Sequence, residues 1–341
     1  MNNLFEKFKD KFYVEINMDF INACKNGNLE EVKYLLNSKH LKANANVEYE
    51  GFKGFLFACA KGQLNIIDYL IAKESWKYDF QQHYENALKF ACAKGHFEIV
   101  KFLLTSDMVK GRDDIIINPG FVSACESGEI EIVKYLFENY KDRLDKFSNC
   151  NSFTIENYLK GALTRACKNG QLDTLSFLLK QVKIKNEDFS YGYILKDYVE
   201  DLFSIACNYS QLQIIDYFLN SPDITKHIKL IIEQDHLEFA CKEGKIELAK
   251  YFLDSPQYSK LFNLNANNDE IFIHAVKQNH NDIIQYLIFD KNIKKTSIID
   301  SHLNYHCNEQ VINWFELRNL KDDLNENLSN PLVNKTTKTK L

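Results

Sequence analysis

Small, apolar and glycine positions follow a fixed order in the segment from Leu88 to Ser106. Ala91 and Cys92 lie on the apolar side of a first predicted helix, and Gly95 stands where that helix must end in a left-handed turn. A second apolar face follows at spacings of three and four residues, formed by Phe97, Val100, Leu103 and Leu104. Two helices of this size cannot bury that face alone, so the pattern predicts a neighbour on each side.

The same pattern recurs along the chain. In seven copies an alanine precedes a cysteine, namely Cys24, Cys59, Cys92, Cys125, Cys167, Cys207 and Cys241, and Val276 takes the cysteine's place in an eighth copy. The intervals between these positions are 35, 33, 33, 42, 40, 34 and 35 residues. A ninth, degenerate copy runs through Leu303, Ile312, Trp314 and Phe315. A period of this length indicates a repeat architecture.

These copies resemble the ankyrin-repeat family. The resemblance rests on the core A-(A/C)-x-x-G-x-(L/I)-x-x-(V/I)-x-x-L-L and on the spacing near 33, and it covers roughly residues 18 to 320. It implies an all-α solenoid of about eight to nine stacked helix pairs, with a partner docked on the concave face. The T-P-L-H opening and the G-A-D-x-N closing turn of the family are absent from every copy. Those departures concern the hairpins between repeats and not the helix pairs.

We expect three segments along the chain. Residues 1–18 are expected to form a capping helix, because the ends of a solenoid need a polar-faced lid; the alternative is an amphipathic membrane anchor in residues 1–13. Residues 19–320 are expected to form the solenoid, and residues 321–341 a polar, disordered tail. The expected repeats lie near 20–38, 55–73, 88–106, 121–139, 163–180, 203–221, 237–255, 272–290 and 299–319.

Two long intervals surround the fifth copy. The additional residues fall in 140–162 and in 181–202, and the second stretch carries Tyr191 and Tyr193. Insertions in solenoids map to loops on one face, often the binding face, and exposed tyrosines favour interfaces. The alternative is sequence drift in a tolerant loop.

Charge and hydropathy exclude several classes of protein. The net charge is −5, with 42 basic and 47 acidic residues, whereas a nucleic-acid-binding domain is expected to be basic. No apolar run reaches the roughly 18 residues of a membrane-spanning helix. The first residues lack the apolar core of a secretory signal. We therefore expect neither nucleic-acid binding nor an integral membrane segment.

The placement of the nine cysteines argues against a disulfide framework. Seven take the same place in successive repeats. Equivalent atoms of neighbouring repeats are expected about 10 Å apart, from the packing distance of helices, and this distance is too long for a disulfide. We expect small, buried, free thiols. Free thiols are typical of a reducing compartment, so the predicted location is the cytoplasm, with the nucleus as a further option.

Few residues suggest chemistry. Cys150 lies in a polar stretch and is a candidate nucleophile, but no base or orienting group is apparent beside it. His302, His306 and Cys307 are a candidate metal site, because histidines four residues apart share a helix face. A degenerate terminal repeat explains these three equally well. We expect no enzyme activity, no cofactor and no metal; an enzyme or metal protein using these residues is the alternative.

The resemblance places the partner at the two positions before each glycine. The candidate residues there are Lys25, Lys61, Lys94, Glu126, Lys168, Tyr209, Lys242 and Lys277. Lysine takes six of these sixteen places and acids take two, against 42 basic residues in 341 overall. One interpretation is a basic surface for an acidic segment of another protein, and the other is the ordinary preference of lysine for helix C-termini. The predicted function is a monomeric, non-catalytic protein-interaction scaffold.

Overall fold

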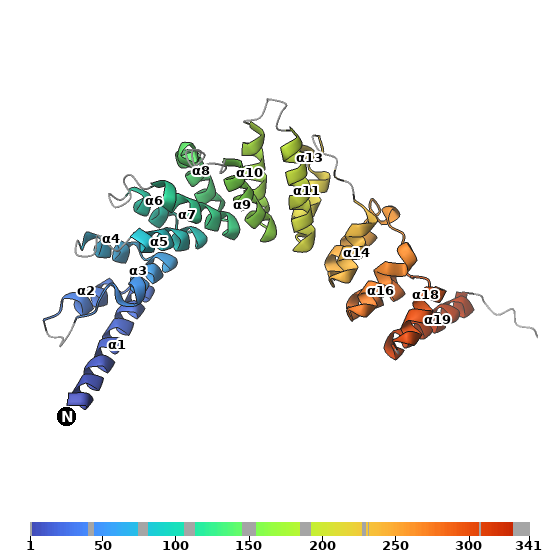
Figure 1. The fold of residues 1–341 in the computed structure, drawn as a ribbon, viewed down its shortest axis with the longest axis horizontal. Helices are drawn as coiled ribbons and strands as arrows, with labels where there is room; N and C mark the ends of the chain where they lie inside the picture. The colour runs from blue at the N-terminus through green and yellow to red at the C-terminus, as the bar shows by residue number, and fades with distance from the viewer. Residues whose placement is uncertain are drawn as a thin grey trace, which may run out of the picture. The chain divides into compact units, whose positions relative to one another are not determined.

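The computed structural model consists of helix pairs joined by tight turns, and the pairs stack side by side within each of two units (Figure 1). It describes residues 2–39, 44–73, 81–105, 113–144, 155–184, 192–226, 230, 232–306 and 308–329. Within these ranges the regular structure is helical, and no strand occurs. The prediction of an all-α, helix-pair solenoid is therefore confirmed.

Each repeat contributes a first and a second helix. The first helices are α1 (Asn2–Asn26), α3 (Tyr49–Lys61), α5 (Gln81–Ala93), α7 (Asp113–Ser127), α9 (Ile155–Lys168), α11 (Gly192–Asn208), α14 (Gln234–Lys242), α16 (Glu270–Lys277) and α18 (Ser297–Tyr305). The second helices are α2 (Leu29–Asn37), α4 (Leu64–Ala72), α6 (Phe97–Thr105), α8 (Ile130–Leu144), α10 (Leu172–Ile184), α12 (Leu212–Asn220), α15 (Ile246–Asp254), α17 (Asn281–Gln285) and α19 (Glu309–Ser329). Short connecting helices are α13 (Pro222–Thr225), η3 (Ser259–Leu261) and η4 (Asn267–Asp269), and the π-helix η5 (Tyr286–Asp290) continues α17.

The chain divides within α12 into an N-terminal unit, residues 1–214, and a C-terminal unit, residues 215–341. In the N-terminal unit the first helices pack in chain order from α1 to α11 (Figure 1). Their second helices form another layer, in which α2 packs on α4 and α8 packs on α6 and α10. In the C-terminal unit α14, α16 and α18 form the first layer, and α15 packs on α17 in the second.

The alanine and cysteine that mark each repeat lie in the core. All seven cysteines at this position, hereafter the Cys position, are free and buried, and Val276 at the equivalent place is also buried. Burial raises the pKa of the thiols of Cys24, Cys167, Cys207 and Cys241 to about 12. Their thiolates are therefore disfavoured at neutral pH, and these cysteines act as small apolar side chains.

The turn after each first helix is left-handed, as the glycines predict. Six glycines at this position have φ between +71° and +81°: Gly27, Gly62, Gly95, Gly128, Gly170 and Gly244. Ser210 and Asn279 adopt the same conformation in the sixth and eighth repeats, at φ +53° and +57°. A side chain with a Cβ pays a steric cost there. The eighth repeat is also irregular in its second helix, where α17 passes into η5.

Two other glycines allow close approach of neighbouring first helices. A Cβ added to Gly54 in α3 would lie 2.7 Å from Cε1 of Phe20 in α1. A Cβ added to Gly120 in α7 would lie 3.2 Å from Sγ of Cys92 and 3.2 Å from Cγ of Leu88, both in α5. These positions are helical, so the glycines serve packing between repeats and not a turn.

The two ends of the chain differ from the sequence expectation. Residues 2–18 do not form a separate capping helix, because α1 continues without a break to Asn26 and includes the first helix of the first repeat. At the other end α19 runs to Ser329, so the expectation of disorder from residue 321 is wrong as far as that residue. The two helices of the ninth repeat bury Leu303 in α18 and Phe315 in α19. The rest of the tail, residues 330–341, lies outside the described residues.

The two insertions lengthen helices instead of forming loops alone. The first lengthens α8, and the second lengthens α10 and α11. Second helices elsewhere in the N-terminal unit have 9 residues, whereas α8 has 15 and α10 has 13. The prediction that these insertions form surface loops is therefore wrong for the part of each insertion that is described.

Candidate interaction surface

The predicted partner-binding residues lie at the C-terminal ends of the first helices, where the chain enters the left-handed turn. In the N-terminal unit Lys25, Lys61, Lys94 and Lys168 are exposed, and Lys242 and Lys277 are exposed in the C-terminal unit. They do not occupy one position of the repeat. Four of them directly follow the Cys position, whereas Lys61 and Lys94 come one residue later. The lysines therefore lie on two neighbouring rows.

Contacts between neighbouring repeats show how these rows are arranged. The residue after the Cys position faces the residue before the marker alanine of the next repeat. Lys25 Nζ lies 5.9 Å from the centre of the Phe57 ring, and Arg165 Nη1 lies 2.9 Å from Glu126 Oε2. Lys168 reaches the turn of the next repeat, where its Nζ lies 4.7 Å from the centre of the Tyr209 ring. Glu126 thus interrupts the basic row, and an exposed arginine offsets its charge.

The middle of this surface is apolar instead of basic. The register that joins Lys25 to Phe57 places Ala60 beside Phe90 and Ala93 beside Ser123. Phe90 is 42% exposed although it is a large aromatic residue. Ala60 is small at a position where other repeats carry lysine or glutamate, and Phe90 is exposed, whereas Phe57 is half-buried beside Lys25. We call Phe57, Ala60, Phe90 and Ala93 the apolar strip; Lys61 and Lys94 follow directly after its two alanines.

Beneath this surface runs a ladder of polar side chains that the sequence analysis missed. The residue after each left-handed turn reaches back to a main-chain carbonyl of the preceding repeat. Gln211 Nε2 donates to Lys168 O at 2.8 Å and Gln171 Nε2 to Glu126 O at 3.4 Å. The other rungs are Gln63 Nε2 to Lys25 O, His96 Nε2 with Ala60 O, and His280 Nε2 with Lys242 O. The signal was present in the sequence, since this position is polar in all eight clear copies.

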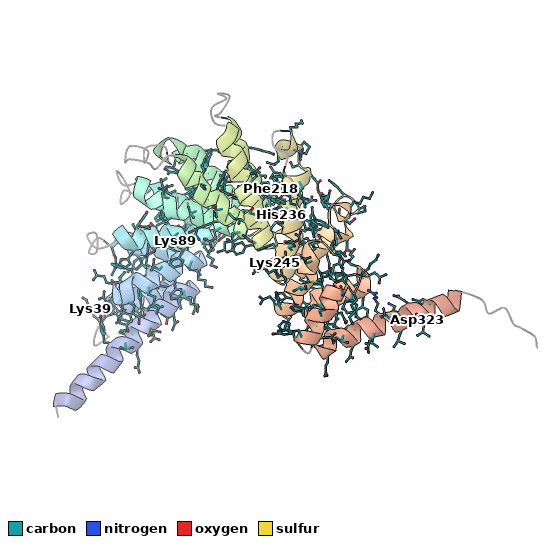
Figure 2. The ribbon with its side chains drawn as sticks, turned by 45° about the vertical axis from the view of Figure 1, so that its right-hand side comes forward. Lys39, Lys89, Phe218, His236, Lys245 and Asp323 are labelled. Carbon is teal, nitrogen blue, oxygen red and sulfur yellow. The ribbon has the colours of Figure 1, made fainter. Side chains whose placement is uncertain are left out.

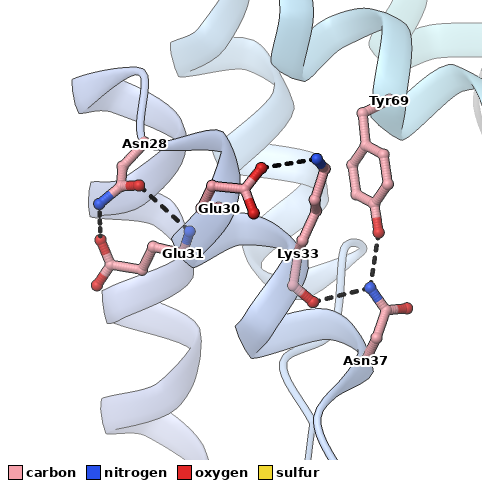
Figure 3. A network of polar contacts seen from close by, with 6 residues as sticks. All are labelled: Asn28, Glu30, Glu31, Lys33, Asn37 and Tyr69. Atoms are coloured by element: carbon pink, nitrogen blue, oxygen red, sulfur yellow. Dashed lines mark hydrogen bonds and ion pairs between the residues drawn. The ribbon is translucent and has the colours of Figure 1, made fainter.

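In the first repeat the residue after the left-handed turn is Asn28, and its side chain makes a different contact. Asn28 accepts a hydrogen bond from the main-chain N of Glu31 at 3.2 Å and donates to Glu31 Oε2 at 2.8 Å (Figure 3). This side chain therefore caps α2. At the other end of α2, Asn37 Nδ2 donates to Tyr69 Oη of the second repeat at 2.6 Å (Figure 3). Polar side chains thus tie the outer layer of helices together as well.

One rung of the ladder is occupied by a side chain that cannot donate. In the fourth repeat Glu129 occupies the position that follows the left-handed turn. Its carboxylate lies against Gly95 of the preceding repeat, so a Cβ added to Gly95 would be 2.5 Å from Oε2 of Glu129. We expect Glu129→Gln to raise the free energy of unfolding by about 0.5–1.5 kcal/mol, the usual net value of one hydrogen bond. Guanidinium denaturation followed by circular dichroism measures this change.

The reverse substitution is the matched control. Gln211→Glu removes the donor of an observed rung, so it is expected to destabilise the chain by a similar amount. If both substitutions shift stability in the same direction, the ladder is not the cause.

Of the candidate metal and catalytic residues, the structure places only His302 and His306 next to each other. The rings of His302 and His306 lie 4.5 Å apart between centres, and both ring nitrogens of His302 are buried without a hydrogen-bond partner. Burial lowers the pKa of His302, and the neighbouring His306 and Lys277 lower it further. Within the described ranges no group of three or more histidine, cysteine or acidic side chains is placed to hold a metal ion. Cys307 and Cys150 lie outside those ranges.

The tyrosine-rich insertion is described only in part. Tyr191 lies outside the described residues, and so does the side chain of Tyr193. Tyr198, five residues after Tyr193, is half-buried and donates from Oη to Lys160 O in α9 at 2.6 Å. One tyrosine of this stretch therefore serves packing between repeats. The side chains of residues 1–11, which make up most of the alternative membrane anchor in residues 1–13, are not described either. No described helix is both long and apolar enough to span a bilayer.

Comparison with known families agrees with the helix-pair architecture. A family model described as "Ankyrin repeats (3 copies)" matches residues 20–114 and 203–298, which together make up more than half of the chain. The first match includes the apolar strip and the lysines beside it. No curated protein matches the sequence.

Proposed function

Because the chain belongs to the ankyrin-repeat family, we propose that it is a non-catalytic scaffold that binds another protein through the ends of its first helices in the N-terminal unit. Ankyrin repeats are generally protein–protein interaction modules. The observation that supports this site is the apolar strip with its exposed aromatic side chain, bordered by Lys25, Lys61 and Lys94. Exposed aromatic residues beside cations are typical of interfaces and are not required by the fold.

The composition of the surface suggests the chemistry of the partner. Carboxylates on the partner would meet Lys25, Lys61 and Lys94, while bulky apolar side chains would cover Phe57 and Phe90. The partner is therefore proposed to be a protein segment in which acidic residues alternate with large apolar ones. Its association would be accelerated by the charges and weakened by added salt.

A selection from random twelve-residue peptides displayed on phage tests this proposal with the full-length chain as bait. We expect enriched peptides to combine acidic and large apolar residues. The best peptide, labelled and titrated by fluorescence anisotropy, should bind the variant Lys61→Glu/Lys94→Glu at least tenfold more weakly than the unsubstituted chain. The thermal midpoint should change little, because surface substitutions of this kind typically cost within about 0.5 kcal/mol each.

The matched control carries the same change of charge in the outer helix layer. Lys33→Glu/Lys134→Glu alters half-buried Lys33 of α2 and exposed Lys134 of α8, and it should leave peptide affinity nearly unchanged. Equal loss of affinity in both variants would show that net charge and not this surface governs binding. Selection of peptides without acidic residues would contradict the proposed partner.

A further inference from the structure

The last helix carries a row of leucines that no described residue covers. Leu317, Leu320 and Leu324 in α19 are 57%, 59% and 62% exposed. Val311 and Phe315, on the opposite side of the same helix, are each 1% exposed and face the C-terminal unit. Single exposed leucines are common on protein surfaces, but three in a row on one helix face indicate an interaction site.

The spacing of the leucines is that of a coiled-coil seam. They are separated by three and then four residues, which gives them positions a, d and a of a heptad. Gln310 and Asn313 occupy the preceding a and d positions and are also exposed, so this side of α19 is open over most of its length. In Figure 2 the part of α19 labelled at Asp323 projects away from the other helices of its unit.

The charges beside the leucines favour one arrangement of two such helices. Glu316 occupies position g and Lys321 the next position e, and both are exposed. In a parallel pair, position g of one helix faces the following position e of the other, so each glutamate meets a lysine. In an antiparallel pair, like flanks meet, and Glu316 approaches Asp323 of the partner subunit. Arg318 pairs with Asp322 at 3.7 Å on the opposite side of the helix and takes no part.

We propose that α19 pairs in parallel with α19 of a second copy of this chain, burying the three leucines and joining Glu316 to Lys321 of the partner subunit. The monomer expected from the sequence is replaced by a dimer that forms through this helix. A seam of three leucines is short. However, packing within its own repeat already holds α19 in helical form. The free energy of dimerisation therefore does not have to offset the entropy lost in forming the helix.

Sedimentation velocity of the full-length chain over a wide range of concentration tests for the dimer. The average mass should rise with concentration toward twice that of one chain. Leu320→Glu should keep the mass at one chain throughout, with an unchanged circular dichroism spectrum. Asn319→Glu is the matched control, since it adds the same charge to the same helix one position outside the seam, and it should still dimerise. A chain that remains monomeric at every concentration overturns the proposal, as does equal association of all three proteins.

A charge exchange tests the parallel register. Glu316→Lys and Lys321→Glu should each weaken self-association at least tenfold, because like charges then face each other. An equimolar mixture of the two variants should recover association, and so should the chain that carries both substitutions, because each restores opposite charges across the seam. If neither the mixture nor the doubly substituted chain recovers association, the proposed register is wrong. If Glu316→Lys alone associates more tightly than the unsubstituted chain, the helices pair antiparallel and not parallel.

Discussion

Replacing Phe121 by alanine is expected to lower the free energy of unfolding by about 3–5 kcal/mol, the largest effect of any single substitution considered for this chain. Phe121 lies in α7, and its side chain is completely buried. Because α7 packs against both α5 and α9, the cavity left by the ring would weaken the stack in the middle of the N-terminal unit. Equilibrium denaturation followed by circular dichroism measures the loss.

Phe90→Ala provides the matched control for this prediction. It makes the same chemical change in the neighbouring first helix, but at a side chain that is 42% exposed. Its cost should be well below that of Phe121→Ala, since less apolar area returns to water. Similar losses for the two variants would contradict the assignment of buried and exposed faces. A stable Phe90→Ala chain with reduced peptide affinity would further support the proposed interaction surface.

Replacing Cys92 by serine is expected to cost about 1–3 kcal/mol, because a hydroxyl would be buried without an assured partner. Cys92 is fully buried, and its Sγ lies close to Gly120 of the next repeat. Burial also raises the pKa of this thiol above its usual range. Cys92→Ala should cost less than Cys92→Ser. The native protein should react slowly with a thiol reagent at all seven cysteines of the Cys position.

Cys167→Ser is the informative comparison for the cysteine prediction. Sγ of Cys167 donates to Leu202 O at 3.2 Å, so a serine there can keep a hydrogen bond. We expect Cys167→Ser to destabilise the chain less than Cys92→Ser does. The burial interpretation fails if all seven thiols react rapidly before unfolding, or if serine is tolerated equally well at both sites.

Much of the fold could be predicted because the residues within each repeat determine the helices and the turn of that repeat. The alternation of Ala-Cys, glycine and spaced apolar residues determines two helices and a left-handed turn within about twenty residues. Even the departures are readable, since Ser210 and Asn279 adopt the turn that glycine adopts elsewhere. The lengths of helices were harder to predict. Residues 321–329 are mostly polar and lie beyond Phe315, which is buried, yet α19 continues through them, because extending a formed helix costs less than nucleating one.

The candidate surface was only half predicted. The sequence pattern identified the lysines, but it combined the first and the second residue after the Cys position into one row. The contacts of Lys25 with Phe57 and of Glu126 with Arg165 separate those positions. The exposed side chain of Phe90, 42% exposed, became apparent only in the structure. Which residue of one repeat faces which residue of the next depends on how helices pack, and an unaligned sequence does not contain that register.

The sequence by itself determined the repeat, the helix pair, the left-handed turn and the buried thiols, because each depends on residues close together in the chain. Only the tertiary structure decided the relations between repeats. Gly54 and Gly120 matter because another helix approaches them, and the polar ladder exists because a side chain meets the carbonyl of the preceding repeat. The leucines of α19 matter because no described residue covers them. Those relations join residues about 28 to 45 positions apart, or leave a face without a neighbour, and only packing in three dimensions determines them.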